Sequence, residues 1–474
     1  MPKALTAIST HFVHVGRSTA CCACRWSDTH ADGATRAPWA VDNNRKPNSC
    51  VSGLQSFGLL HATCTERDVL ARVNQFRMEE CMSVTTKRNS NTKTTVHTVV
   101  REKSQSNDIA ARARKIAAEA VGVDSHIDTV QRVLVMDEDL SKRWDVGHVD
   151  IPRLHAGGTH APFFALWVPV YFPGAEAVRR TLDLRDAMQT LFDAHKNLIE
   201  LATTAADIER IVKERKIAAF LTVEGGHTID DDLRVLRMYY QLGIRSMTLT
   251  HSRNNNWADS ATDKPVHNGL TDFGKEVVRE MNRLGMVVDV SHVADKTFYD
   301  ALDVTSKPVM LTHSSMRALS DVPRNVTDEM LWALAKNGGV VGITFGEGFI
   351  NPKDADALRA AIEVETTAPV LSGRTLDDYA AQDVRKLFGT RVKVAATVED
   401  VADHIDHAVK VAGIDHVGIG SDFDGVSGPP KGLDDVSKMP ALIEVLLERG
   451  YSDRDLKKIL GGNTLRVIRE VTGK

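Results

Sequence analysis

Short apolar runs alternate with amphipathic segments along the chain from about residue 106 onward. The runs are rich in Val, Ile and Leu, and most of them end in a polar residue. Near-continuous apolar runs of this length are typical of strands in a parallel sheet that helices cover on both faces. The pattern therefore predicts strands at 217–224, 244–251, 286–292, 308–313, 340–345 and 416–422.

The segments between these runs carry the signals of helix starts and ends. Thr271 precedes an apolar stripe of helical period that stops at Gly285, which predicts a helix between a Thr N-cap and a Gly C-cap. The same punctuation predicts a helix at 397–413 and another from Ser452 onward. The alanine-rich stretch 107–120 predicts a further helix, with which the ordered part of the chain begins.

This alternation of strands and helices suits a (β/α)8 TIM-type barrel with insertions. A doubly wound open sheet is the alternative, but no Gly-x-Gly-x-x-Gly follows a predicted strand, which disfavours a dinucleotide-binding fold. We predict that residues 106–474 form the barrel domain. Residues 1–105 show neither strand nor helix period and are predicted to form a disordered N-terminal tail.

Composition and charge exclude some classes of function. The chain is 42% hydrophobic and 26% charged, with a formal net charge of −4, which offers no electrostatic footprint for nucleic acid or an anionic membrane. No run of about 18 apolar residues is present, and the first thirty residues lack an apolar leader segment. We therefore expect neither a membrane span nor a membrane anchor.

The N-terminal tail holds all six cysteines, which lie before residue 82. Its CCAC run leaves a tail metal site as one alternative, although no matched pair of CxxC motifs follows. A second alternative is that the tail is unstructured. A third is that the protein naturally starts at Met82, so that residues 1–81 are not part of it. Mass spectrometry of the native N-terminus distinguishes these hypotheses, because a native peptide from residues 1–81 would exclude a start at Met82.

The motif His-x-Asp occurs four times, beginning at His30, His126, His148 and His404. Only the pair of His126 and Asp128 follows a short apolar segment, where residues two apart face the same side of a strand. The His404 pair lies inside a predicted helix, where residues two apart point about 200° away from each other. His30 lies in the tail, and His148 lies in a loop before a proline. Position therefore favours His126 and Asp128 as metal ligands.

Other predicted strands end in residues that bind metals or transfer protons, namely Glu224, His251, His292, His313 and Asp422. The carboxyl ends of barrel strands meet at one face, where active sites form. One buried histidine is ordinary in a core, but five such strand ends are not explained by packing. Imidazoles and carboxylates suit zinc, and two ions about 3.5–4 Å apart can hold a hydroxide and polarise a carbonyl. The strand ends therefore indicate a barrel of the metal-dependent hydrolase kind, and no Gly-x-Ser-x-Gly offers a serine route.

Long motifs run in order from about residue 110 to the C-terminus: DSHIDT, TVEGGHTID, LGIRSMTLTHSRNNNWADS, GLTDFGKEVVREMNRLGMVVDVSHV, PVMLTHSSMRAL, RNVTDEML, AGIDHVGIGSDFDG and LGGNTLRV. Together they resemble the membrane (renal) dipeptidase family, the M19 metallopeptidases. The tail has no part in this resemblance. The resemblance implies that His126 and Asp128 bind a first zinc ion, that His292 and His313 bind a second, and that Glu224 bridges the two.

The resemblance also implies roles in binding and catalysis. His251 would contact the scissile carbonyl and help to stabilise the oxyanion. Arg324 would pair with the C-terminal carboxylate of the substrate, whereas the alternative for it is a solvated surface charge. Asp422 would shuttle a proton between the bridging water and the leaving amine. His227 would orient its own loop, and Asp424 would support the site without taking part in catalysis.

The chain departs from the family pattern in two places. Ser125 and Ile127 replace a glycine and an asparagine, neither of which is a ligand, so metal binding should survive. The run SRNNNW beside His251 replaces Ser-Cys-Asn-x-x-Trp, which changes the pocket for the N-terminal side chain of the substrate. The end VIREVTGK has no apolar tail and the predicted domain has no cysteine, which resembles the soluble bacterial branch. We expect a cytoplasmic protein, with export left open by the uncertain start, and the family resemblance suggests a homodimer.

The sequence predicts a binuclear zinc dipeptidase. It would cleave dipeptides with a free C-terminal carboxylate, with an L- or D-residue at the second position, by attack of a metal-bridging hydroxide. One alternative keeps the barrel and metals but takes N-acyl amino acids, lactams or lactones. A second alternative is a metal-dependent binding or scaffold protein, which would have no need of Asp422 as a proton shuttle.

Overall fold

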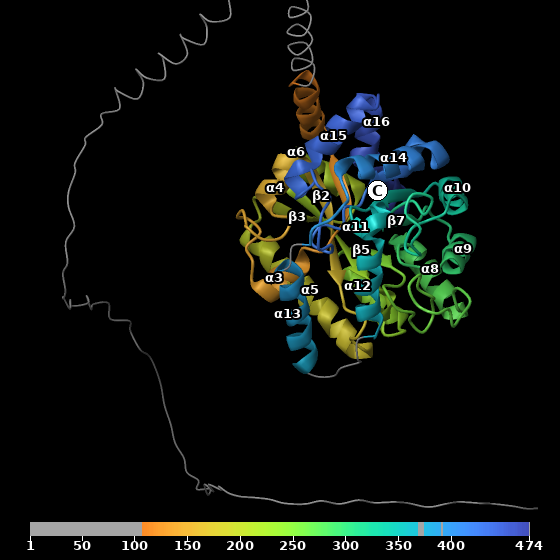
Figure 1. Cartoon of the computed structure of the whole chain (residues 1–474). Helices are drawn as coiled ribbons and strands as arrows, with labels where there is room; N and C mark the ends of the chain where they lie inside the picture. The colour runs from red at the N-terminus through yellow and green to blue at the C-terminus, as the bar shows by residue number, and fades with distance from the viewer. Residues whose placement is uncertain (1–106, 368–373, 390–391, 474) are drawn as a thin grey trace, which may run out of the picture. The chain divides into compact units, whose positions relative to one another are not determined.

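The computed structural model describes residues 107–367, 374–389 and 392–473 (Figure 1). Residues 107–119 are helical, as the alanine-rich stretch predicts. The predicted tail, the cysteine run and the start at Met82 lie outside the described residues. The boundary between tail and barrel domain near residue 105 therefore stays a prediction.

Eight parallel strands close into a barrel within the described part of the chain. Neighbouring strands pair around the ring, β9 pairs with β1, and β2 pairs with β4. This closure confirms the (β/α)8 barrel and excludes the open doubly wound sheet. The ring consists of β1 (Gly122–Ile127), β2 (Thr159–Trp167), β4 (Ile217–Glu224), β5 (Ile244–Thr248), β6 (Val287–Asp289), β7 (Met310–Ser314), β8 (Val340–Ile343) and β9 (Val417–Ile419).

A ninth strand, β3 (Ile199–Ala202), lies outside the ring. It pairs with the first half of β4, at 217–220, whereas β2 pairs with the second half, at 220–224. The closed ring is therefore completed on the half of β4 that ends at Glu224. Neither β2 nor β3 is among the strands that the sequence predicts.

Helices follow the strands and surround the barrel (Figure 1). Thr271 accepts a hydrogen bond from Gly274 N and Gly285 takes φ 82°, so both predicted caps are confirmed. Thr397 forms a capping box with Asp400. The helices are α3 (Val130–Met136), α4 (Ile151–Gly157), α5 (Gly174–Ala194), α6 (Ala205–Lys213), α7 (Leu233–Gln241), α8 (Asp272–Leu284), α9 (Asp295–Val304), α10 (Asp328–Asn337), α11 (Glu347–Ile350), α12 (Ala355–Thr367), α13 (Arg374–Gly389), α14 (Val398–Ala412), α15 (Met439–Glu448), α16 (Asp453–Lys457) and α17 (Asn463–Thr472).

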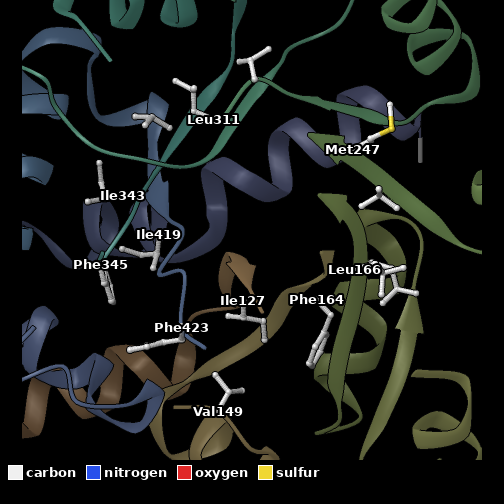
Figure 2. Packing of buried hydrophobic residues seen from close by; sticks show 14 of the residues in the cluster. Ile127, Val149, Phe164, Leu166, Met247, Leu311, Ile343, Phe345, Ile419 and Phe423 are labelled. Carbon is white, nitrogen blue, oxygen red and sulfur yellow. The ribbon is translucent and has the colours of Figure 1, made fainter. Parts of the chain in front are cut away.

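The barrel interior changes from apolar to polar along β4. Phe220 stacks on Phe163 of β2 with ring centroids 4.3 Å apart, within a cluster of fully buried apolar residues. Thr222 and Glu224 follow at intervals of two and so face the same side of the strand. The other strand faces join the large apolar cluster, of which Figure 2 shows Ile127, Val149, Phe164, Leu166, Met247, Leu311, Ile343, Phe345, Ile419 and Phe423.

The interior thus presents its polar side chains at the carboxyl end of the strands, which is where active sites of such barrels form. Within residues 107–367, 374–389 and 392–473, no helix combines the length and the apolar character needed to cross a membrane.

Candidate metal centre

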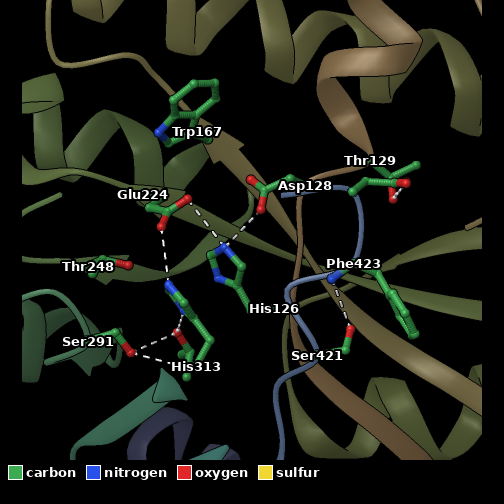
Figure 3. A network of polar contacts seen from close by, with 12 residues as sticks. His126, Asp128, Thr129, Trp167, Glu224, Thr248, Ser291, His313, Ser421 and Phe423 are labelled. Carbon is green, nitrogen blue, oxygen red and sulfur yellow. Dashed lines mark hydrogen bonds and ion pairs between the residues drawn. The ribbon is translucent and has the colours of Figure 1, made fainter. Parts of the chain in front are cut away.

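The strand ends bring the predicted ligands together, and Figure 3 shows His126, Asp128, Glu224 and His313 of this group. His126 and Glu224 stand at the ends of β1 and β4, and His313 stands in β7. His251 and His292 lie in the loops just past β5 and β6, because those strands end earlier than predicted. Asp128 and Asp422 complete the group from the segments after β1 and β9.

Glu224 lies at the centre of this group. Its Oε2 is 3.3 Å from His126 Nε2. Its Oε1 is 3.0 Å from His292 Nε2, 3.4 Å from His313 Nε2 and 3.7 Å from His251 Nε2. The two carboxylate oxygens therefore face different sets of nitrogen donors, an arrangement that suits a carboxylate shared by two cations.

Among the described residues, three groups each have ligand atoms that lie within 4.8 Å of one another. They are His126, Glu224 and His313; Glu224, His251 and His292; and His126, Asp128 and Asp422. The predicted first pair, His126 and Asp128, is 3.4 Å apart between Nε2 and Oδ2. His251, predicted to contact the substrate, also lies close enough to Glu224 to share a cation with it.

Buried atoms without partners test whether a metal fits. Both ring nitrogens of His126, Oδ1 of Asp128 and Nδ1 of His292 are buried without a hydrogen-bond partner among the described residues. A buried polar atom left without a partner destabilises the fold by about 1–3 kcal/mol. Cations would satisfy His126 and Asp128 directly, so the residues present fit a metal centre.

The electrostatics of the site favour a bound cation. Burial alone would lower the pKa of His126, but the Glu224 and Asp128 carboxylates raise it well above its usual value. Burial alone would raise the pKa of Glu224, but His126 and His251 hold it well below its usual range. Burial and the neighbouring Asp128 raise the pKa of Asp422 well above the usual carboxyl value. The site therefore attracts positive charge, and one of its carboxyl groups binds a proton readily.

The backbone takes a left-handed conformation at three residues of this region, His292 (φ 66°), Asp422 (φ 63°) and Asp424 (φ 70°). For a residue other than glycine this conformation costs about 1–3 kcal/mol and persists only where the surroundings hold it. Here Asp422 N donates to His126 O at 3.0 Å, and Asp128 N donates to Phe423 O at 2.9 Å. The ends of β1 and β9 thus hold each other in place.

Arg324 is buried beside the cluster, with 5% of its surface exposed, and is not a surface charge. It donates from Nη2 to His313 O at 3.2 Å and from Nη1 to Ser314 Oγ at 3.4 Å. Its guanidinium lies 5.3 Å from the centre of the Phe349 ring. Burial lowers the pKa of Arg324 to about 10, which still leaves it charged at neutral pH.

Asp424 connects the segments around the proposed metal ligands. It accepts hydrogen bonds from Thr129 Oγ1 at 2.7 Å, Arg132 Nη1 at 2.9 Å and His148 N at 2.6 Å. This agrees with the supporting role predicted for it. His227 lies in a short 3-10 helix at Gly226–Ile229, and its predicted effect on the loop stays a prediction.

Sequence reasoning missed several polar neighbours of the ligands. Trp167, at the end of the unpredicted strand β2, directs its indole Nε1 toward His251 Nδ1 at 3.5 Å. Asp289 and Thr312 lie inside the barrel next to His313. The signal for these two was a polar residue inside an apolar run, in VVDV and MLTH.

The closed barrel and the cluster at its carboxyl end define a metal-dependent enzyme of the TIM-barrel class. Comparison with known proteins specifies the family. The model of the "Membrane dipeptidase (Peptidase family M19)" family matches residues 110–473. The chain therefore belongs to the membrane dipeptidase family, peptidase family M19, whose members are metal-dependent dipeptidases.

Individual relatives agree with this family. The chain is 34% identical over 385 residues to dipeptidase tcpJ of Claviceps purpurea, covering 77% of this chain and 81% of that protein. It is 36% identical over 330 residues to mouse dipeptidase 3, covering 69% of this chain and 58% of the mouse protein. Among solved structures, the probable dipeptidase PvdM from Pseudomonas aeruginosa matches with a TM-score of 0.66 at 26% identity, over 77% of this chain and 99% of that one.

Proposed function

We propose that the chain is a binuclear zinc dipeptidase that cleaves dipeptides with a free C-terminal carboxylate and an L- or D-residue at the second position. The observation that carries this proposal is the position of Glu224, whose Oε2 faces the imidazole of His126 and whose Oε1 faces those of His292 and His313. The membership of the M19 family supplies the class of reaction.

In this proposal each cation has its own pair of ligands and shares Glu224. His126 and Asp128 would hold the first zinc ion, and His292 and His313 would hold the second. When bound, the two ions polarise the scissile carbonyl and lower the pKa of water toward neutrality. The partnerless buried atoms of His126 and Asp128 support this assignment.

Asp422 and His251 provide proton transfer and oxyanion stabilisation. Asp422, whose carboxyl binds a proton readily, takes the proton of the attacking water and passes it to the leaving amine. The indole of Trp167 can only donate, so His251 Nδ1 accepts from it and neutral His251 has its proton on Nε2. His251 can therefore donate a hydrogen bond to the developing oxyanion.

Arg324 selects substrates with a carboxylate. A buried guanidinium beside the metal ligands can pair bidentately with the C-terminal carboxylate of a dipeptide. Its hydrogen bonds to His313 O and Ser314 Oγ fix its orientation toward the site. Substrates that lack this carboxylate, such as simple lactones, would leave the arginine unpaired.

The first test combines metal content with dipeptide hydrolysis on the same purified sample. We expect about two zinc ions per chain. We also expect hydrolysis of L-Xaa-L-Xaa or L-Xaa-D-Ala that is lost in Asp422→Asn. The matched control is Asp406→Asn, because the Asp406 carboxylate in α14 contacts Arg449 and Tyr451 and none of the proposed ligands.

Two other outcomes contradict parts of the proposal. Bound zinc without turnover of dipeptides would support the metal centre but contradict the dipeptide substrate, and would favour N-acyl amino acids or lactams as substrates. Absence of stoichiometric metal would contradict the binuclear centre itself. The homodimer that the family resemblance suggests and the cytoplasmic location expected from the sequence stay predictions, and size-exclusion chromatography with light scattering tests the first of them.

The role of Arg324 has its own test. Replacing Arg324 by Lys keeps the charge but loses the bidentate geometry, so KM for dipeptides should rise by about tenfold or more with a smaller change in kcat. Arg449→Lys is the control, because Arg449 pairs with Asp403 and Asp406 of α14, whereas Arg317 holds the backbone on both sides of Arg324. An unchanged KM in Arg324→Lys and in Arg324→Ala would contradict the carboxylate assignment.

A further inference from the structure

A layer of polar side chains lies inside the barrel next to the proposed metal ligands. Thr248 of β5, Asp289 of β6 and Thr312 of β7 are each completely buried. Figure 3 shows the neighbouring Thr248, Ser291 and His313 with the proposed ligands. A carboxylate in such an interior needs hydrogen-bond donors. The identity of those donors determines which neighbouring side chains the carboxylate can orient.

Asp289 accepts four hydrogen bonds, two on each oxygen. Oδ1 accepts from the backbone nitrogens of Ser291 at 2.9 Å and Thr312 at 3.0 Å. Oδ2 accepts from the hydroxyls of Thr248 at 2.5 Å and Thr312 at 2.6 Å. The two oxygens are therefore not equivalent, because one faces fixed backbone donors and the other faces hydroxyls.

The single proton of the Thr312 hydroxyl decides the direction of the next hydrogen bond. Thr312 Oγ1 lies 2.6 Å from the Asp289 carboxylate, 2.9 Å from His313 Nδ1 and 3.4 Å from Ser291 Oγ. A hydroxyl donates its proton to the charged and nearest acceptor, which is Asp289. Thr312 Oγ1 must then accept from His313, so His313 has its proton on Nδ1 and a lone pair on Nε2.

That lone pair faces the centre of the cluster. His313 Nε2 lies 3.4 Å from Glu224 Oε1 and 2.8 Å from His292 Nε2. By contrast, the Nδ1 atoms of His126 and His292 have no hydrogen-bond partner among the described residues. Nothing comparable therefore fixes the tautomer of these two histidines.

We propose that Asp289 is a positioning residue that sets the tautomer of His313 through Thr312, so that His313 Nε2 is ready to bind a cation before the cation arrives. This rests on the metal centre proposed above. Hydrogen-bond partners of this kind fix the orientation and basicity of metal-bound histidines. Asp289 itself touches neither the cations nor the substrate.

The isosteric change Asp289→Asn should reverse the chain of hydrogen bonds. The amide carbonyl must occupy the Oδ1 position, because two backbone nitrogens donate there. The amide nitrogen then occupies the Oδ2 position and donates to Thr312 Oγ1. Thr312 in turn donates to His313 Nδ1, which moves the histidine proton to Nε2 and blocks that nitrogen as a ligand.

Two threonines form a matched pair for the experiment, since both donate to Asp289 Oδ2 and both are fully buried. Zinc is titrated into the metal-free protein against a chromophoric chelator, and the absorption spectrum of the cobalt-substituted protein is recorded. We expect the affinity of the weaker site to fall by about 10–100-fold in Asp289→Asn. It should fall less in Thr312→Val and stay near the wild-type value in Thr248→Val and Thr312→Ser.

Several outcomes would overturn the inference. Equal loss of affinity in Thr248→Val and Thr312→Val would mean that Asp289 acts only by holding the barrel together. Wild-type affinity and an unchanged cobalt spectrum in Asp289→Asn would mean that it does not act on His313. Circular dichroism of the metal-free variants checks folding, and the threonine pair decides if Asp289→Asn does not fold. Wild-type protein without stoichiometric metal would contradict the proposed centre instead.

Discussion

The same three-residue pattern stands at two places in the molecule with opposite consequences. His126-Ile127-Asp128 follows a buried strand, and its imidazole and carboxylate approach each other to 3.4 Å. His404-Ile405-Asp406 lies within α14, where the two side chains point in different directions. His404 points into the core, and Asp406 contacts Arg449 and Tyr451 near the surface.

The hydrogen bonds of the two histidines show what the difference means. His404 Nδ1 accepts from Met316 N at 2.9 Å, and its Nε2 lies 3.0 Å from Ile350 O, so both nitrogens are satisfied by backbone. Both nitrogens of His126 are buried without a hydrogen-bond partner among the described residues. One histidine is therefore fixed by the backbone, whereas the other directs Nε2 toward the carboxylates of Asp128 and Glu224, with which it could hold a cation.

The largest expected effect is the loss of metal and activity on replacing His126 by Ala. The first cation would lose one of its ligands, so kcat/KM for dipeptides should fall by about 10³-fold or more. Zinc content by mass spectrometry and a dipeptide assay check this. His404→Ala, made in parallel, should keep both zinc content and kcat per folded molecule, and loss of zinc there would break the comparison.

His404→Ala should instead destabilise the protein. The change leaves a buried backbone N–H at Met316 and a buried carbonyl at Ile350 without partners and creates a cavity. We expect the free energy of unfolding to fall by about 2–5 kcal/mol, measured by urea denaturation of the metal-free proteins. A loss below about 1 kcal/mol would show that water replaces the ring at this site.

Acid should weaken the fold through His404. Burial lowers the pKa of His404 from 6.5 to about 4. Because the folded-state value is the lower one, the stabilisation is complete above about pH 6.5 and is lost as the pH falls toward 4. Between pH 7.5 and pH 5 the metal-free wild type should lose about 2 kcal/mol that His404→Gln does not lose. Parallel pH dependences of the two proteins would contradict this assignment.

The smallest effect is expected at Asp406. This carboxylate accepts from Arg449 Nη1 at 2.6 Å and Tyr451 OH at 2.7 Å, with 42% of its side chain exposed. Solvent-exposed ion pairs contribute about 0–1 kcal/mol, so Asp406→Ala should change stability by no more than that. Asp128→Ala serves as its counterpart and should lower zinc affinity, which equilibrium dialysis measures.

Much of the site could be predicted because parallel strands end on the same face of a barrel. The sequence alone shows short apolar runs that stop at Glu224 and His313, or shortly before His251 and His292. The helix in which His404 lies is visible in the same way, from its Thr397 cap and apolar period. Periodicity was therefore sufficient to separate two identical motifs.

The rest depends on contacts between distant segments. Strand β2 escaped prediction because Pro162 and two alanines within 159–167 weaken its strand signal, while its pairing with β1 and β4 supplies the order. Strand β3 has only four residues. The link from Asp289 to His313 joins two strands through a hydroxyl, and no local pattern reports the direction of such a hydrogen bond.

The left-handed backbone at His292 and Asp422 limits which substitutions evolution or engineering can use to stabilise such a protein. Glycine would adopt these angles without strain, so a selection for heat resistance alone would favour glycine at both positions. Each such step would remove a group to which we assign a role in the proposed chemistry. Ancestors and engineered variants that keep both residues must therefore accept local strain as a condition of activity, and additional thermal resistance has to come from elsewhere in the barrel.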